Sequence, residues 1–128
     1  MSSPERGCAG VLVIEDDADI LHAVVQVLED EGYAVRAAEN GRVALATLRE
    51  PGARPPCVIL LDLMMPVMDG WAFRAEQLRD PALAAIPVIV LTADGSAVEK
   101  AALMNGAGAL RKPVELATLL EAIAPYIT

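Results

Sequence analysis

Acidic side chains follow two strongly apolar segments of this chain. Glu15 and Asp16 come directly after residues 11–14 (VLVI), and Asp62 follows the run 57–61 (CVILL). Continuous apolar runs of this length are typical of strands buried on both faces of a parallel sheet. Ligands bind where the carboxyl ends of such strands meet at one edge. The pattern therefore predicts one acidic pocket built from these three carboxylates.

Two further polar residues occupy equivalent positions. Thr92 follows the apolar run 88–91, and Lys112 follows residues 109–111. Three clustered carboxylates repel one another and require neutralising protons or a cation nearby. Oxygen-only ligands suit Mg²⁺, or Mn²⁺ as a substitute. A lysine ammonium and a threonine hydroxyl can both bind phosphoryl oxygens. Together these residues predict a phosphoryl-transfer site whose nucleophile is a carboxylate.

The segments that must position these residues alternate between two patterns. Apolar runs predict strands over residues 11–14, 33–38, 57–62, 88–92 and 109–111. Helical spacing of apolar residues, with Asp17, Asn40 and Asp69 as candidate caps, predicts helices over residues 17–31, 40–48, 69–79, 96–105 and 114–124. This alternation predicts an α/β fold, a doubly wound five-stranded parallel sheet with five helices. The order of the strands does not follow from the pattern.

Composition narrows the class of protein. A chain of 128 residues is one domain, and its net charge of −8 argues against a nucleic-acid or anionic-membrane surface. The first residues lack a signal-peptide pattern and no apolar segment reaches membrane-spanning length, so a cytoplasmic protein is expected. Cys8 and Cys57 lack metal-ligand spacing, and we expect reduced thiols, with Cys57 as a small core residue.

These residues and their neighbours resemble the receiver domain of bacterial two-component response regulators. The resemblance rests on four segments in the family's order and spacing: VLVIEDD at 11–17, LDLMMPVMDG at 61–70, VLTA at 90–93 and KP at 112–113. It covers essentially residues 9 to 127. It implies a flavodoxin-like, receiver-type fold, with a leader over residues 1–8 and the receiver domain over residues 9–128.

The resemblance also implies a role for each acidic residue. Asp62 would be the phosphoacceptor, and Glu15 and Asp16 would hold Mg²⁺ together with Asp62 and the backbone carbonyl of Met64. The phosphoryl group would come from a phosphohistidine of a sensor histidine kinase or a phosphotransfer protein. The domain would then be a phosphorylation-controlled switch for a downstream protein target rather than an enzyme. No output domain follows residue 128 in this sequence, so we expect either a stand-alone regulator with protein partners as its output or a receiver excised from a longer chain.

The remaining matched positions complete the implied switch. Thr92 would bind the phosphoryl group, with small Ala93 leaving room for it. Lys112 would pair with a phosphoryl oxygen, and a cis bond to Pro113 is expected from the family. Contacts of this kind bias a two-state equilibrium towards the phosphorylated form. The aspartyl phosphate would hydrolyse by itself, and Met64 and Asp94 are our candidates for setting its lifetime.

One position departs from the family pattern. The family usually has Tyr or Phe three residues before the lysine, where this chain has Ala109. The stretch from Gly106 to Lys112 is also one residue shorter than usual. We therefore predict that phosphorylation is read out differently from the usual coupling between threonine and an aromatic side chain.

Two other functions remain as alternatives. A degenerate receiver would act by binding alone, although the presence of Asp62, Thr92 and Lys112 argues against it. A small Mg²⁺-dependent aspartyl-phosphate phosphatase of the haloacid dehalogenase type would usually carry a second aspartate two residues after the nucleophile. This chain has Met64 there.

Overall fold

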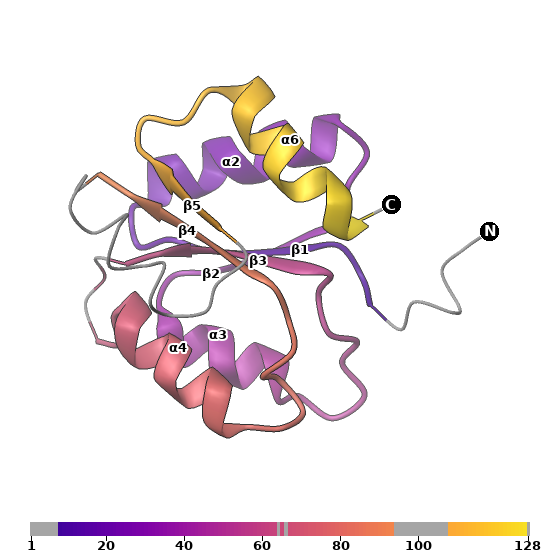
Figure 1. The fold of residues 1–128 in the computed structure, drawn as a ribbon, viewed down its shortest axis with the longest axis vertical. Coiled ribbons are helices and arrows are strands. Elements are labelled where there is room, and N and C mark those ends of the chain that lie inside the picture. The colour runs from indigo at the N-terminus through magenta and orange to yellow at the C-terminus, as the bar shows by residue number, and fades with distance from the viewer. Residues whose placement is uncertain (1–7, 64, 66, 94–107, 128) are drawn as a thin grey trace.

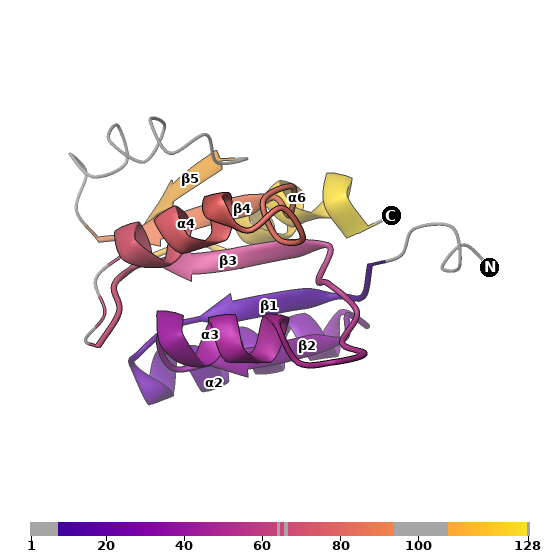
Figure 2. The ribbon, with the colours of Figure 1, turned by 90° about the horizontal axis from the view of Figure 1, so that it is seen from below.

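A five-stranded parallel sheet forms the centre of the molecule. The structure, a computed structural model, describes residues 8–63, 65, 67–93 and 108–127. The strands are β1 (Val11–Ile14), β2 (Val35–Ala38), β3 (Val58–Asp62), β4 (Val88–Thr92) and β5 (Gly108–Arg111). They pair in the order β2-β1-β3-β4-β5, which Figure 2 shows from β2 at the bottom to β5 at the top. The direction of winding reverses between β1 and β3, which makes this the switch point of the sheet.

Helices cover both faces of the sheet. Helices α2 (Ala18–Asp30) and α6 (Leu116–Ile127) lie on one face, and α3 (Gly41–Leu48) and α4 (Gly70–Arg79) lie on the other (Figure 1). The predicted doubly wound α/β sheet is confirmed. The helix predicted over residues 96–105 lies outside the described residues. Among the described elements, β2 starts at Val35 rather than residue 33, and α6 runs from Leu116 to Ile127 rather than over 114–124.

The apolar runs supply two cores at once because successive side chains of a strand point to opposite faces. Leu12 and Ile14 of β1 pack with α3 and α4, whereas Val11 and Val13 pack with α2 and α6. The β3 strand divides in the same way, and every residue from Val58 to Leu61 is fully buried. A strand buried this deeply delivers its last residue to a fixed point at the sheet edge.

Three helices begin at side-chain caps near that edge. Asp17 Oδ1 accepts hydrogen bonds from the amides of Asp19 (2.9 Å) and Ile20 (3.2 Å). Asn40 Oδ1 accepts from Val43 N at 2.9 Å, and Asp69 Oδ1 accepts from Ala72 N at 2.8 Å. Such caps satisfy amides that lack a partner within the helix. Asp17 and Asp69 therefore have a structural role beside the acidic pocket.

The cysteines correct one prediction from the sequence. Cys8 and Cys57 form a disulfide, with their Cα atoms 5.0 Å apart, so the expectation of reduced thiols is wrong for this structure. Ala9 N donates to Pro55 O and Cys57 N donates to Gly10 O, both at 2.8 Å, which brings the two segments side by side. Cys57 lies 49 positions after Cys8, and no periodic pattern surrounds Cys8 to signal the pairing.

Within the part of the chain that the structure describes, no helix is long and apolar enough to cross a bilayer.

Candidate functional site

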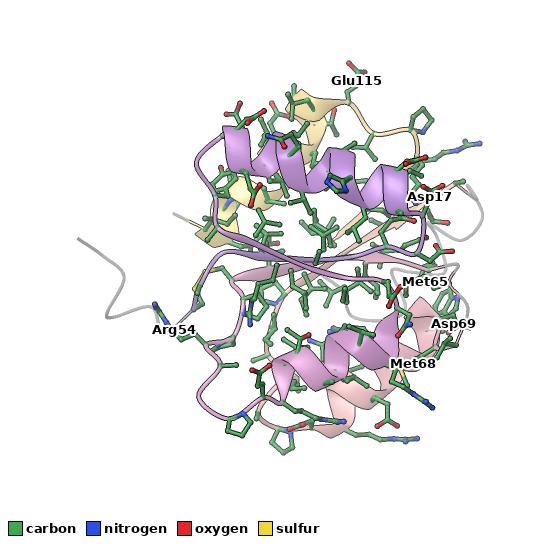
Figure 3. The ribbon with its side chains drawn as sticks, turned by 180° about the vertical axis from the view of Figure 1, so that it is seen from behind. Asp17, Arg54, Met65, Met68, Asp69 and Glu115 are labelled. Atoms are coloured by element: carbon green, nitrogen blue, oxygen red, sulfur yellow. A yellow bond between two sulfur atoms is a disulfide. The ribbon has the colours of Figure 1, made fainter. Side chains whose placement is uncertain are left out.

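The polar residues singled out in the sequence meet at one edge of the sheet. Glu15 and Asp16 follow β1, Asp62 ends β3, Thr92 ends β4 and Lys112 follows β5. The helix caps Asp17 and Asp69 lie at the same end of the molecule, opposite Arg54, as Figure 3 shows. Parallel pairing explains the gathering, since all four strands present their carboxyl ends to this edge.

Three carboxylates form the floor of the site. One oxygen from each of Glu15, Asp16 and Asp62 lies within 4.8 Å of the others. Glu15 is 3% exposed and Asp62 is 5% exposed, whereas Asp16 is open to solvent. Buried carboxylates of this kind need a cation or hydrogen-bond donors to offset their lost hydration. The donor set consists of oxygen atoms alone, which fits a hard divalent cation.

Lys112 supplies a positive charge to this cluster. Its Nζ lies 2.6 Å from Glu15 Oε1 and 3.6 Å from Asp62 Oδ2. Burial on its own lowers the pKa of Lys112, but the hydrogen bond to Glu15 and the negative charges of Asp62 and Glu15 outweigh it. The pKa of Lys112 is therefore raised, and the ammonium stays charged at neutral pH. It offsets one of the three negative charges.

Backbone contacts fix Thr92 and Lys112 beside each other. Lys112 N donates to Thr92 O at 2.8 Å, continuing the pairing between β4 and β5. The peptide bond between Lys112 and Pro113 is cis. Thr92 is fully buried at the end of β4. Thr92 and Lys112 thus lie at the same sheet edge as the carboxylates.

The loop after β3 folds back onto the start of α4. Gly70 N donates to Leu63 O at 3.0 Å, and Gly41 N donates to Met68 O at 3.2 Å. These bonds tie the loop to both helices on this face. The positions Met64 and Asp94, together with the Met64 carbonyl expected as a metal ligand, lie outside the described residues.

Val67 in this loop has a strained backbone. Its φ is +69°, a left-handed conformation that β-branched residues rarely adopt, and its side chain is 72% exposed. We expect Val67→Asn to raise the free energy of unfolding by about 1 kcal/mol, because asparagine tolerates this conformation and little packing is lost. Urea denaturation measures the change. Val43→Asn, at a partly exposed helical position in α3, is the control and should not stabilise. An unchanged or lower midpoint for Val67→Asn would contradict the strain.

Gly70 allows α4 to approach the end of β3. A Cβ at this position would lie 2.8 Å from both Asp62 O and Leu63 Cα, which are backbone atoms. We expect Gly70→Ala to lower the free energy of unfolding by about 1–3 kcal/mol, because the chain around Asp62 must move. Gly108→Ala is the matched control, since no atom lies within 4 Å of the added Cβ. Equal denaturation midpoints for the two variants would contradict this prediction, because they would show that the loop accommodates the methyl group without a loss of stability.

Ala109 occupies the position where the resemblance implies an aromatic side chain. It lies in β5, pairs with Val90, and is partly buried against the core beneath α3 and α4. A methyl group there leaves no ring to swing between buried and exposed positions. The departure noted in the sequence therefore falls inside β5, three residues before Lys112.

An apolar groove beside the site went unnoticed in the sequence. It lies between α2 and α6, has a volume of about 370 Å³, and includes Lys112 in its wall together with Ile20, Val24, Leu91, Ala93, Pro113, Val114 and Leu119. Ile20 is 40% exposed, and Leu116 on the adjoining helix is 45% exposed. No sequence signal marked the groove, because Ile20 and Val24 have the same helical spacing as residues that face the core.

The fold and this edge define a class of protein. The sequence model of the family described as the response regulator receiver domain matches residues 11–124. The chain belongs to this family, and it is a receiver domain of two-component signalling.

Individual relatives agree with this assignment. The chain is 32% identical over 117 residues to protein PilH of Pseudomonas aeruginosa, and the match covers 90% of this chain and 94% of PilH. It is 38% identical to the response regulator MprA of Mycolicibacterium vanbaalenii, covering 86% of this chain but only 46% of MprA. The chain thus spans less than half of some relatives and nearly all of others.

Solved structures share the fold. The chemotaxis response regulator CheY4 of Vibrio cholerae superposes with a TM-score of 0.82 at 31% identity, covering 94% of this chain and 99% of that one. The bacteriophytochrome response regulator RtBRR gives a TM-score of 0.80 at 29% identity, covering 94% of this chain and 79% of that one.

Proposed function

We propose that this receiver domain accepts a phosphoryl group on Asp62, in a Mg²⁺-dependent reaction, from a phosphohistidine of a sensor kinase or phosphotransfer protein. The observation that carries the proposal is the cluster of three carboxylates within 4.8 Å, with the Lys112 ammonium 3.6 Å from Asp62. Asp62 is the last residue of β3, a strand buried along its whole length, and this places its carboxylate at the sheet edge beside Lys112.

The carboxylate set fits the metal that the proposal requires. Glu15, Asp16 and Asp62 would hold Mg²⁺, with the Met64 carbonyl as a further proposed ligand. When bound, Mg²⁺ offsets the repulsion between the carboxylate nucleophile and the phosphoryl oxygens. Asp16 is the exposed member of the cluster, so it faces the side from which a hydrated ion arrives.

The transfer step uses the chain's own groups. An Asp62 carboxylate oxygen forms a bond to phosphorus while the bond between phosphorus and the donor's imidazole nitrogen breaks. The imidazole leaves with the bonding electron pair and is protonated. Lys112, held charged by Glu15 and Asp62, binds an oxygen of the phosphoryl group, and the Thr92 hydroxyl donates to another.

Phosphorylation acts as a switch because Lys112 and Thr92 move towards the new phosphoryl group. An acyl phosphate brings roughly −1.5 to −2 of charge to this edge, by analogy with phosphorylated hydroxyls. Lys112 then exchanges its contact with Glu15 for the phosphoryl oxygens, and Thr92 moves with them. Both residues bias a two-state equilibrium without an aromatic side chain at Ala109. Met64 and Asp94 are proposed to set the lifetime of the phosphoryl group.

The groove between α2 and α6 is the proposed docking surface for the phosphohistidine donor. Lys112 is shared by the groove and the acidic pocket, so a helix seated in the groove brings its histidine to the edge that carries Asp62. The exposed apolar side chains of Ile20 and Leu116 suit an apolar helical surface. The donor's phosphohistidine derives from a nucleoside triphosphate, so the proposal includes a cytoplasmic location. A downstream protein is the second partner, and the domain is a switch rather than an enzyme.

Mapping the modified residue tests the proposal. Wild-type protein is incubated with Mg²⁺ and phosphoramidate, whose P–N bond resembles that of phosphohistidine, and the product is reduced with borohydride. Hydride converts an aspartyl phosphate to homoserine, and we expect homoserine at position 62. Mg²⁺ binding without any adduct would favour a receiver that acts by binding alone. In a parallel incubation with unrelated phosphate esters and Mg²⁺, steady release of inorganic phosphate would favour the phosphatase.

A further inference from the structure

A disulfide joins two strands at the edge opposite the acidic pocket. Cys8 lies three residues before β1, and Cys57 directly precedes β3. These are the two strands whose far ends carry Glu15, Asp16 and Asp62. Hydrogen bonds from Ala9 N to Pro55 O and from Cys57 N to Gly10 O hold the two segments together, each at 2.8 Å.

A cavity lies against the two cysteines. The pair lines a cavity of about 320 Å³ whose other walls include Pro55, Pro56, Ile86 and Pro87. Cys57 is 7% exposed, whereas Cys8 is only partly buried. The greater exposure of Cys8 favours attack of an incoming thiol on Cys8, with Cys57 as the departing sulfur.

Positive charge gathers at the same place. Arg54 Nη2 donates to Cys8 O at 2.9 Å, and Arg36 Nη2 donates to Arg54 O at 2.8 Å. The chain as a whole carries a net charge of −8, whereas this edge carries two positively charged guanidinium groups. They favour an anionic thiol over a neutral one.

We propose that Cys8 and Cys57 form a reversible redox site that exchanges with an anionic low-molecular-weight thiol of the glutathione class. On oxidation, a thiolate of the pair attacks a small disulfide and expels one small thiol, giving a mixed disulfide. The second cysteine then attacks that bond and expels the other small thiol. The protein loses two electrons and two protons, and one small disulfide becomes two small thiols. Reduction follows the same steps in reverse.

The oxidised form fixes the chain before β1 against the chain before β3. Closing a loop of 49 residues restricts the unfolded chain, and it locks the Ala9 and Cys57 amides into their hydrogen bonds. The register between β1 and β3 is held independently by their own pairing from Val11 to Ile14. The site therefore controls stability and the order of residues 8–10, and leaves phosphoryl transfer at Asp62 unchanged.

Equilibration in glutathione buffers tests the proposal on the full chain. Samples at graded ratios of reduced to oxidised glutathione are quenched in acid, alkylated and weighed by mass spectrometry. We expect two alkylated thiols in reduced buffer and none in oxidised buffer, with a mixed disulfide on Cys8 between them. The melting temperature should fall by about 10 °C on reduction, and the Ala9 amide should exchange faster.

Variants distinguish a reversible redox site from a disulfide that serves only to stabilise the fold. The double variant Cys8→Ser with Cys57→Ser should have a melting temperature close to that of the reduced wild type. Its melting temperature should not change with the ratio of reduced to oxidised glutathione. Arg54→Gln should slow exchange with glutathione about threefold and leave exchange with neutral 2-mercaptoethanol unchanged. Two free thiols in excess oxidised glutathione would overturn the proposal, and so would a melting temperature that is independent of redox state. Neither readout depends on phosphorylation.

Discussion

Asp62→Asn is expected to abolish phosphorylation while leaving the fold intact. The carboxylate supplies the attacking oxygen, and an amide of the same shape is a far weaker nucleophile. Asp62 is 5% exposed and lies at the end of β3, so an isosteric change preserves its packing. Removing one of three clustered negative charges should also stabilise the metal-free protein slightly. The phosphorylated fraction is measured on a phosphate-affinity gel after incubation with phosphoramidate and Mg²⁺.

Asp69→Asn is the matched control for this experiment. Asp69 carries the same charge at the same end of the molecule, but its Oδ1 caps α4 by accepting from Ala72 N. Asparagine caps helices as well as aspartate does, so this variant should be phosphorylated like the wild type. Full phosphorylation of Asp62→Asn would place the acceptor elsewhere, and equal loss in both variants would indicate a general effect of charge.

Lys112→Met is expected to weaken the metal-free protein strongly. The change leaves Glu15 (3% exposed) and Asp62 (5% exposed) without the ammonium that lies 2.6 Å and 3.6 Å from their oxygens. Removing one partner of a buried ion pair lowers the free energy of unfolding by about 3 kcal/mol or more. We expect the low end of this range, because the Lys112 side chain is 20% exposed. Saturating Mg²⁺ should restore much of this loss, because the metal binds the folded carboxylates.

The effect of pH gives Lys112→Met a second readout. The pKa of Lys112 is raised above 10.5 in the folded protein, since the Glu15 hydrogen bond and the charges of Asp62 and Glu15 outweigh burial. Its contribution to stability is therefore fully present below about pH 10.5, the pKa of an unfolded lysine, and is lost as the pH rises through the folded value. The difference in unfolding free energy between wild type and variant should be constant from pH 7 to about 10 and then shrink.

Arg111→Met is the matched control for Lys112. It removes a positive charge from the neighbouring residue, whose side chain is exposed at the end of β5. We expect a change within about 0.5 kcal/mol in urea denaturation, with or without Mg²⁺. A similar loss of unfolding free energy in both variants would contradict the role of Lys112 in offsetting the carboxylate charges. So would a Lys112→Met variant that Mg²⁺ does not stabilise.

The sequence was most informative about the strands and their ends. Fully apolar runs such as residues 58–61 mark buried parallel strands, because a strand covered on both faces has no polar side to alternate with. Since parallel strands end together, Glu15, Asp16 and Asp62 could be placed in one pocket before any coordinates were known. Asp69 was likewise identified as a cap, because an acidic residue before a helical pattern usually accepts from its first amides.

Other features depend on contacts that no local pattern encodes. The bond between Lys112 and Glu15 joins residues 97 positions apart and requires a particular side-chain conformation. The strand order and the groove between α2 and α6 arise only when the helices pack. The disulfide was missed because the expectation of reduced thiols came from the presumed compartment and not from geometry. The cis bond before Pro113 was expected only from the resemblance.

Intact mass spectrometry of the wild-type chain tests the central claim most directly. The protein is incubated with phosphoramidate in Mg²⁺ or in a chelator, and each sample is weighed without reduction. The account predicts one added phosphoryl group in Mg²⁺ and none in chelator, with the adduct lost over time as the acyl phosphate hydrolyses. An adduct that forms equally well without a divalent cation, or no adduct although Mg²⁺ binds, would contradict it.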